Sequence, residues 1–309
     1  MAEKQSATRD AYGDALVRLA LSEQFYVLDA DLSKATKTSR FAAEFPHRFF
    51  DMGIAEADMM TTAAGLASCG IPVFASTFAV FAAGRAFEQI RNSIAYPKLN
   101  VKIAATHGGV LIGEDGASHQ AIEDVALMRS LPNMTVVAPC DRISTYQLVK
   151  QALQWKGPVY LRFGRYESPE LYREDAVLTL GKGQVLRTGT DVTVAAYGDM
   201  VAEACRAADL LRQEGIEAEV IDLHTIKPLD AELLQKSVQK TGRIVTAEDH
   251  NIIGGLGSAV SELLAEHEPA PMRRVGVKDR FGASGRKAEL AQAYGLTAEA
   301  IVQACKELI

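Results

Sequence analysis

Short apolar runs rich in β-branched and aromatic residues alternate with amphipathic segments along the chain, and this alternation is the strongest constraint on its fold. In the first half, runs with the length of a buried strand stand at 25–30, 72–77, 100–106, 134–139 and 158–163. Segments with helical periodicity separate them, at 8–22, 55–69, 80–95, 121–131 and 141–155. Strands that alternate with helices build a parallel sheet covered by helices on both faces. We therefore predict an α/β fold with a doubly wound first domain.

A less regular, polar stretch at 164–190 interrupts this alternation, which then resumes. Further strand-like runs follow at 191–197, 218–223, 243–249 and 273–278. A chain of 309 residues is long enough for two ordinary domains with buried cores. We expect a first domain over residues 1–170, a linker over 171–190, and a second, smaller doubly wound α/β domain over 191–309.

The charge balance argues against ligands that bind through a broad positive surface. The chain has 33 Lys and Arg residues against 39 Asp and Glu residues, which gives a net charge of −6. Nucleic acids and anionic membranes attract surfaces of the opposite sign. We expect no nucleic-acid or membrane partner, and any polyanionic ligand must be held locally.

Cysteine usage and the start of the chain favour the cytoplasm. The four cysteines, Cys69, Cys140, Cys205 and Cys305, lie far apart, with no CxxC pair and no Cys/His cluster. This pattern fits a reducing compartment and predicts no zinc site, so we expect all four to be core residues. The first ten residues contain no apolar core of a signal peptide. A cytoplasmic protein is expected.

Residues 59–84 contain no charged side chain. The sequence Gly70-Ile71-Pro72 breaks this stretch, which therefore predicts a helix, a turn, a short strand and the start of a second helix rather than a membrane span. A chain hides such a segment either in its own core or against a partner. We expect a subunit interface, and core burial is the alternative.

An acidic residue stands where a ligand of an α/β sheet would bind, beyond the carboxyl end of a strand. Residues 49–52 predict a short strand, and Glu56 falls in the first turn of the helix that follows. The helix dipole alone would favour a carboxylate there. Because the rest of that helix is apolar, Glu56 is also flanked by surface of low dielectric constant, which suits it to sharing a proton.

A second group of polar residues follows the strand at 100–106. The loop from 107 to 120 contains four glycines, two of the six histidines, and the carboxylates of Glu114 and Asp115. Glycines let the backbone approach a ligand closely, and loops of this kind carry functional groups. The pattern favours a binding loop over an ordinary surface loop.

At these positions the sequence resembles the transketolase family. THGGVLIGEDGASHQ at 106–120 is similar to the family's TH…GEDGxxHQ signature, and GIAEADMMTTAAGLA at 53–67 resembles the segment with its pyrimidine-contacting glutamate. Shorter matches are DADL at 29–32, TFAVF at 77–81 and VIDLHTIKPLD at 220–230. The resemblance spans nearly the whole chain, in order. It implies a pyrimidine-binding domain followed by a transketolase C-terminal domain.

One motif of thiamine diphosphate enzymes is missing. The family holds the diphosphate and Mg²⁺ through a GDG sequence followed by an Asn, and this chain has no GDG. The chain therefore resembles the C-terminal half of a transketolase encoded as a separate subunit. This implies an N-terminal partner subunit with the Mg²⁺ ligands, and we expect an α₂β₂ assembly.

The resemblance also implies which residues hold the cofactor. Glu56 would bond to N1′ of the aminopyrimidine, so that the exocyclic nitrogen can take a proton from the thiazolium carbon. Phe78 and Phe81, expected at a helical i, i+3 spacing, would form the apolar slot for the pyrimidine. Leu32 matches the residue that keeps the cofactor bent, and Asp31 matches the acidic residue beside it.

A further set matches the family's substrate residues. His107 matches a donor-binding histidine, Asp115 a carboxylate that binds a hydroxyl, and His119 a histidine close to the donor carbonyl; both histidines are catalytic candidates. Arg9 and Arg165 match two phosphate ligands, and two guanidiniums suit a sugar phosphate. A solvated arginine remains the alternative for each.

Several departures loosen the substrate assignment. Ala55 and Ala57 flank Glu56 where transketolases usually have Arg and His, and Gly108 stands where they have Asp. Gly84 replaces an aromatic residue, and Ala35 replaces a phosphate-binding serine. A branched or otherwise unusual sugar phosphate would fit such a pocket.

Three other functions stay open at this stage. The β chain of a 2-oxo-acid dehydrogenase has the same two domains but lacks the TH…GEDGxxHQ loop. 1-Deoxyxylulose-5-phosphate synthase contains both halves in one chain and lacks the Thr-His pair. A non-catalytic paralogue would not need Glu56. We expect a transketolase-type subunit that transfers a two-carbon ketol unit between a ketose phosphate and an aldose phosphate.

Overall fold

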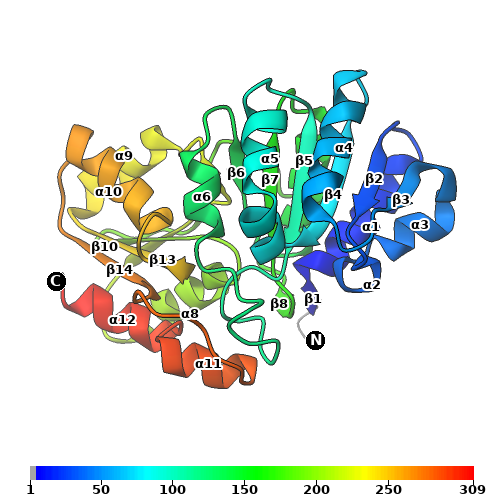
Figure 1. The fold of residues 1–309 in the computed structure, drawn as a ribbon. Coiled ribbons are helices and arrows are strands. Elements are labelled where there is room, and N and C mark those ends of the chain that lie inside the picture. Colours follow the sequence, from blue (N-terminus) through cyan, green and yellow to red (C-terminus); the bar gives the residue numbers. More distant parts are fainter. Residues whose placement is uncertain (1–4) are drawn as a thin grey trace.

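The computed structural model describes residues 5–309, which form two α/β units lying side by side (Figure 1). The first unit is drawn in blue to green and the second in yellow to red, with strands and helices interleaved in both. The fold class predicted from the alternating pattern is confirmed. The expected start of the first domain, at residue 1, lies outside the described residues.

The first unit is built on a sheet whose strand order is β12-β6-β7-β5-β4-β2-β3. All neighbours in it are parallel except β12 and β6. Its strands from the first half of the chain are β2 (Tyr26–Asp29), β3 (Phe49–Asp51), β4 (Val73–Phe78), β5 (Val101–Thr106), β6 (Thr135–Val137) and β7 (Val159–Phe163). Each falls on a run that the sequence predicts to be a strand.

The helices of this unit are α1 (Thr8–Ala20), α2 (Ser33–Thr36), α3 (Ser39–Glu44), α4 (Glu56–Ser68), α5 (Phe87–Gln89), α6 (Asp124–Ser130) and α7 (Arg142–Gln154). Helices α1 and α7 pack against each other, and α4 packs on β4. Short helices α2 and α3 and the 3₁₀ turn η1 (Pro46–Arg48) were not predicted. Residues 80–95 differ most from expectation, because η2 (Phe81–Arg85) and η3 (Ile90–Ala95) are π-helical and only α5 between them is α-helical.

The uncharged stretch lies mainly in the core of its own chain. It forms most of α4, all of β4 and the start of η2, as predicted. Met59, Met60 and Ala63 of α4 are completely buried, together with Val73 and Phe74 of β4. Core burial, the alternative to a subunit interface, therefore accounts for most of these side chains, while an interface role for the exposed remainder stays a prediction.

The second unit has the strand order β14-β13-β10-β11-β9, in which only β9 is antiparallel to its neighbour. Its strands are β9 (Gln184–Arg187), β10 (Val192–Ala196), β11 (Ala218–Asp222), β13 (Ile244–Asn251) and β14 (Met272–Val277). Its helices are α8 (Met200–Gln213), α9 (Ala231–Thr241), α10 (Leu256–His267), α11 (Lys287–Tyr294) and α12 (Ala298–Lys306).

The segment expected to be a linker contains one sheet strand. Strand β9 lies within 171–190 and pairs with β11, so the second unit begins before residue 191. Just ahead of the linker, β8 (Glu167–Pro169) pairs with β1 (Gln5–Ala7) as an antiparallel ribbon. Strand β12 (Thr225–Lys227) was missed altogether and crosses back to the edge of the first sheet beside β6. The two units are therefore joined by more than a connecting segment.

The cysteine prediction holds for three of four residues. Cys140, Cys205 and Cys305 are buried, whereas Cys69 is exposed because it follows the last turn of α4. A search of residues 5–309 finds no helix with the length and hydropathy needed to cross a bilayer.

Candidate active site

The predicted functional segments meet at one edge of the first sheet. Strands β2, β4 and β5 are parallel neighbours, and Asp29 pairs with Ser76 while Phe78 pairs with Thr106. Because parallel strands end at the same edge, the segments that follow them emerge together. This topology brings residues 30–36, 78–85 and 107–120 into one region.

An aromatic stack forms the centre of this region. The ring of Phe78 lies 3.8 Å from the imidazole of His107, and the ring of Phe81 lies 5.8 Å from Phe78 with an interplanar angle of 11°. His119 points its edge at Phe81, with ring centroids 5.4 Å apart. The expected helical spacing of the two phenylalanines was wrong, since Phe78 ends strand β4 and Phe81 begins η2. The rings nevertheless stack.

Glu56 is the first residue of α4, as predicted, and only 3% of it is exposed. Its carboxylate accepts two contacts from Nη1 of Arg85, at 3.1 Å to Oε1 and 3.3 Å to Oε2. The same guanidinium lies 4.1 Å from the centre of the Phe81 ring. Glu56 and Phe81 thus lie within reach of one flat, nitrogen-bearing group that can stack on the ring and hydrogen-bond to the carboxyl group. An aminopyrimidine is flat and its ring nitrogen can share a proton with a carboxyl group, so these residues fit the group.

His107 is held as a neutral imidazole. Its Nε2 lies 3.1 Å from Nη1 of Arg9, which can only donate, and its Nδ1 lies 2.8 Å from Oγ1 of Thr106. The proton must therefore be on Nδ1. Burial, together with the nearby guanidiniums of Arg9 and Arg165, lowers the pKa of His107 to about 2. His107 is suited to accepting or relaying a hydrogen bond, not to protonating a substrate at neutral pH.

Both predicted anion ligands lie near His107, with different partners. Arg9 also donates to the carbonyl of Ala35, at 3.3 Å, and its Nε is buried without a hydrogen-bond partner. Arg165 donates to the carbonyl of Ile112 at 2.6 Å and pairs with Asp115 at 3.0 Å. Arg165 therefore braces the glycine-rich loop, and Asp115 is already engaged by it. The Nε of Arg9 makes no hydrogen bond and has the carboxylate of Asp10 3.8 Å away.

Asp31 and Leu32 lie on a turn that wraps around a buried carboxylate. Asp29, which the sequence did not single out, accepts from the Leu32 amide at 2.7 Å and from Thr36 and Thr38 at 2.6 and 2.8 Å. Burial raises the pKa of Asp29, and these hydrogen bonds oppose that rise. Asp31 itself is exposed and has a positive φ of 60°. The turn leads into α2, where the carbonyl of Ala35 accepts from Arg9.

Two residues of the site were missed. Arg85 lies four positions after Phe81, but its contact with Glu56 depends on the π-helical course of η2. Tyr166 donates to Glu114 at 2.7 Å. Its position directly after Arg165 is the one sequence feature that could have indicated its place in the site. The helix expected over residues 121–131 begins only at Asp124.

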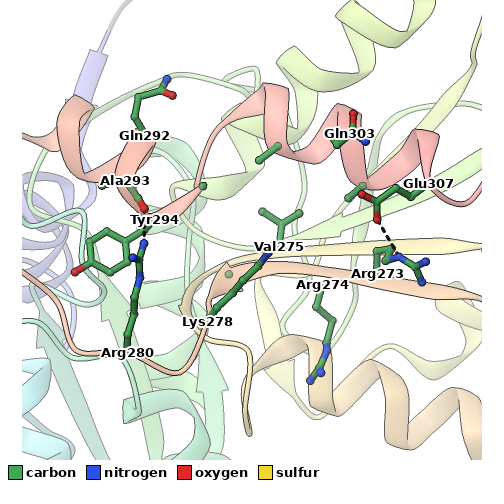
Figure 2. A pocket seen from close by; sticks show the side chains of 14 residues that line it. Arg273, Arg274, Val275, Lys278, Arg280, Gln292, Ala293, Tyr294, Gln303 and Glu307 are labelled. Carbon is green, nitrogen blue, oxygen red and sulfur yellow. Dashed lines mark hydrogen bonds and ion pairs between the residues drawn. The ribbon is translucent and has the colours of Figure 1, made fainter.

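A hollow of about 670 Å³ lies elsewhere, between β14 and helices α11 and α12 of the second unit (Figure 2). Its arginines have partners of their own. Arg273 pairs with Glu307 at 3.1 Å, Arg274 donates to the carbonyl of Ile252 at 2.9 Å, and Arg280 donates to Ala293 and stacks on Tyr294. These side chains turn to different sides and do not converge on one point. The strand-end region of the first unit is therefore the candidate active site.

The part of the chain that the structure describes contains no gathering of three or more His, Cys, Asp or Glu side chains suited to a metal ion.

Comparison with known families matches both units. Residues 4–170 match the model of the transketolase pyrimidine-binding domain, and residues 181–301 match that of the transketolase C-terminal domain. The second match begins before residue 191, in agreement with the position of β9.

Individual relatives cover almost the whole chain. It is 49% identical to a putative transketolase C-terminal section of Methanocaldococcus jannaschii, over 97% of this chain and 95% of that protein. It is 44% identical to a 6-deoxy-6-sulfo-D-fructose transketolase subunit of a Clostridium species, over 97% and 94%. A solved structure described as a split gene transketolase, inactive β₄ tetramer, superposes with a TM-score of 0.92 at 56% identity, over 98% of both chains.

Proposed function

Because this chain belongs to the transketolase family and matches its pyrimidine-binding and C-terminal domains, we propose that it is the C-terminal subunit of a split transketolase. The cofactor is thiamine diphosphate, on which the family depends. An N-terminal subunit would supply the diphosphate and Mg²⁺ site, for which this chain has no GDG motif. The name of the solved relative, an inactive β₄ tetramer of a split-gene transketolase, supports a requirement for that partner.

The proposal rests on one observation: the buried carboxylate of Glu56 lies close enough to the Phe81 ring for a single guanidinium to contact both. Thiamine diphosphate, when bound, supplies a nucleophilic carbon that adds to the donor carbonyl and holds the two-carbon unit. The buried carboxylate of Glu56 would bond to N1′ of its pyrimidine and hold the shared proton there. Phe81 would stack on the ring, while Phe78 is already covered by His107 and supports Phe81 from behind.

The donor would lie between the cofactor and the loop at 107–120. Neutral His107 offers a fixed hydrogen-bond partner beside Phe78, and His119 lies next to Phe81. Arg9 contributes a guanidinium whose buried Nε makes no hydrogen bond and has the carboxylate of Asp10 3.8 Å away, which suits a terminal oxyanion of the substrate. A phosphate and a sulfonate both present three oxygens to a guanidinium, and a sulfo-sugar is named for one relative. We propose a ketose with such a terminal oxyanion as the donor and an aldose phosphate as the acceptor.

An α₂β₂ assembly is the arrangement that we propose for the active enzyme. The cofactor site is split between two polypeptides, so each active site requires one copy of each subunit. Ile54, 74% exposed, and Phe50, 44% exposed, lie in the segment just before Glu56. These apolar side chains would be covered where the partner closes over the pyrimidine.

Reconstitution tests the proposed function. The chain would be combined with its N-terminal partner, thiamine diphosphate and Mg²⁺, and assayed with ketoses that end in a phosphate, a sulfonate or a free hydroxyl, each with a panel of aldose phosphates. Two-carbon transfer from a donor with a terminal oxyanion is the expected result. Absence of transfer from every donor by a complex that binds the cofactor would contradict the proposal.

A further inference from the structure

The glycine-rich loop of the first unit is held by a carboxylate of the second unit. Asp249, on β13, is 3% exposed. Its Oδ1 accepts from the amide of Val110 at 2.8 Å, and its Oδ2 accepts from the amide of Leu111 at 3.1 Å. Both donors belong to the loop that contains His107 and His119. A single side chain, 139 and 138 residues away in sequence, thus satisfies two consecutive loop amides.

The contact is close enough to exclude side chains from the loop. Gly109 has φ +88°, and a Cβ built on it would lie 1.9 Å from Oδ2 of Asp249. A Cβ on Gly108 would lie 2.6 Å from Cζ of Arg162. Arg162 in turn donates to the carbonyl of Asp249 at 2.9 Å and pairs with Asp124 at 2.8 Å. The space beside both glycines is therefore filled by the groups that hold the loop.

The far end of the loop is fixed to the second unit as well. Gln120 donates to the carbonyl of Ala283 at 2.8 Å and to that of Val110 at 3.0 Å. Between these anchors, Glu114 and Asp115 are exposed. The second unit thus determines the course of the loop while leaving its tip open to a ligand.

We propose that Asp249 is a positioning residue, through which the C-terminal domain sets the geometry of the substrate loop. This inference rests on the proposed function only in assigning the loop to the substrate. The chemistry suits the task, because a carboxylate that accepts from two backbone N–H groups is a stronger anchor than a neutral acceptor. Burial raises the pKa of Asp249 to about 6 and Arg162 opposes that rise, so the group is ionised at neutral pH.

Hydrogen exchange of the full chain measures this anchor directly, without partner or cofactor. In Asp249→Asn, one acceptor oxygen becomes an NH₂ group that cannot accept from a loop amide. The amide that loses its acceptor, that of Val110 or of Leu111, should then exchange about tenfold faster, which corresponds to the loss of one hydrogen bond of about 1.4 kcal/mol. Glu248→Gln is the matched control. Glu248 is its buried neighbour and accepts from the Leu256 and Gly257 amides of α10, not from the loop.

A second pair of variants keeps the test decisive if Asp249→Asn fails to fold. Gly109→Ala leaves Asp249 in place but pushes its carboxylate away, whereas Gly113→Ala has nearly the same positive φ, +90°, and meets only the Tyr166 side chain. Faster exchange of the Val110 and Leu111 amides in Gly109→Ala alone is expected. Unchanged exchange in every folded variant at 109 and 249, or the same increase in the controls, would overturn the proposal.

The reconstituted enzyme provides the functional readout. Asp249→Asn should raise the KM for the ketose donor by about tenfold and leave the dissociation constant of thiamine diphosphate unchanged, while Glu248→Gln should leave the KM unchanged. An equal rise in the KM in Asp249→Asn and Glu248→Gln would show that Asp249 has a merely structural role. Loss of transfer in the unsubstituted complex would contradict the proposed function, but the exchange result would still decide the role of Asp249.

Discussion

The guanidinium of Arg85 lies against the carboxylate of Glu56, with Nη1 3.1 Å from Oε1, and at the same time covers the ring of Phe81 at 4.1 Å. An aminopyrimidine could take both places, by stacking on Phe81 and by sharing a proton between its ring nitrogen and Glu56. The side chain of Glu56 is 4% exposed and that of Arg85 is 52% exposed, so the guanidinium can leave while the carboxylate stays in place. On the proposed function, the cofactor would therefore compete with an internal cation for Glu56 and Phe81.

Arg85→Ala should therefore tighten thiamine diphosphate binding to the complete enzyme. A half-exposed ion pair stabilises a protein by less than about 1 kcal/mol, and this is the free energy that the cofactor would have to overcome. We therefore expect the dissociation constant of thiamine diphosphate to fall by about two- to fivefold. Calorimetric titration of the reconstituted complex measures it. A weaker cofactor complex would show that Arg85 assists binding instead of competing with it.

Glu56→Gln should lower turnover by about two to four orders of magnitude, since glutamine is nearly isosteric but cannot share a proton with N1′ of the pyrimidine. Exchange of the cofactor's C2 proton, followed by NMR, should slow in parallel. Asp58→Asn, at an exposed position in the same first turn of α4, is the control and should leave exchange unchanged. A wild-type exchange rate in Glu56→Gln would remove Glu56 from its assigned role.

Arg165→Ala should raise the KM for a phosphorylated donor by about ten- to a hundredfold, with a smaller change in kcat, and spare a non-phosphorylated analogue. The guanidinium braces Asp115 and the Ile112 carbonyl, so it also shapes the pocket for the anion. Arg173→Ala, which removes an exposed arginine paired with Asp175, is the control. An equal rise in the KM for the phosphorylated donor and for the non-phosphorylated analogue would show that Arg165 only supports the loop.

Some residues of this site are placed by the strand that precedes them, and these could be predicted from the sequence. Others are placed by contacts with residues far away in the sequence, and these could not. Glu56, Phe78 and His107 lie at or just after strand ends, and parallel strands align their ends, so their convergence could be inferred from the alternating pattern. The partner of Glu56 could not, because Arg85 reaches it only through the π-helical η2, and periodicity predicts an ordinary helix there.

Contacts between the two units were likewise beyond local sequence patterns. Strand β12 has only three residues and pairs with β6, which lies nearly ninety positions earlier. The sequence predicts Asp249 to be part of a buried strand. Nothing near it in the sequence indicates that its carboxylate accepts from the amides of Val110 and Leu111. Such pairings are fixed by tertiary packing, which overrides local preference.

Lys102 gives a pH-dependence that can be tested on the chain alone. It is completely buried on β5, and its Nζ donates to the carbonyls of Trp155 and Gly157 at 2.7 and 2.8 Å, just after α7. Burial lowers the pKa of Lys102 to about 7 from its usual 10.5. Between these values the unfolded chain binds the proton and the folded chain does not, so stability is lost as the pH falls toward 7.

The free energy of unfolding should therefore rise between pH 7.5 and 9, by up to about 1.4 kcal/mol per pH unit. Lys102→Met should abolish this slope, whereas Lys150→Met, at an exposed position on α7, should keep it. Denaturant titrations at several pH values measure the slope. The same slope in Lys102→Met would assign it to another group.

The central claim is that this chain supplies only the pyrimidine half of a thiamine diphosphate site. Calorimetric titration with thiamine diphosphate and Mg²⁺, first of the chain alone and then of an equimolar mixture with its N-terminal partner, tests it most directly. The account predicts no measurable saturation by the chain alone and tight, stoichiometric binding by the mixture. Tight binding by the chain without its partner would contradict it.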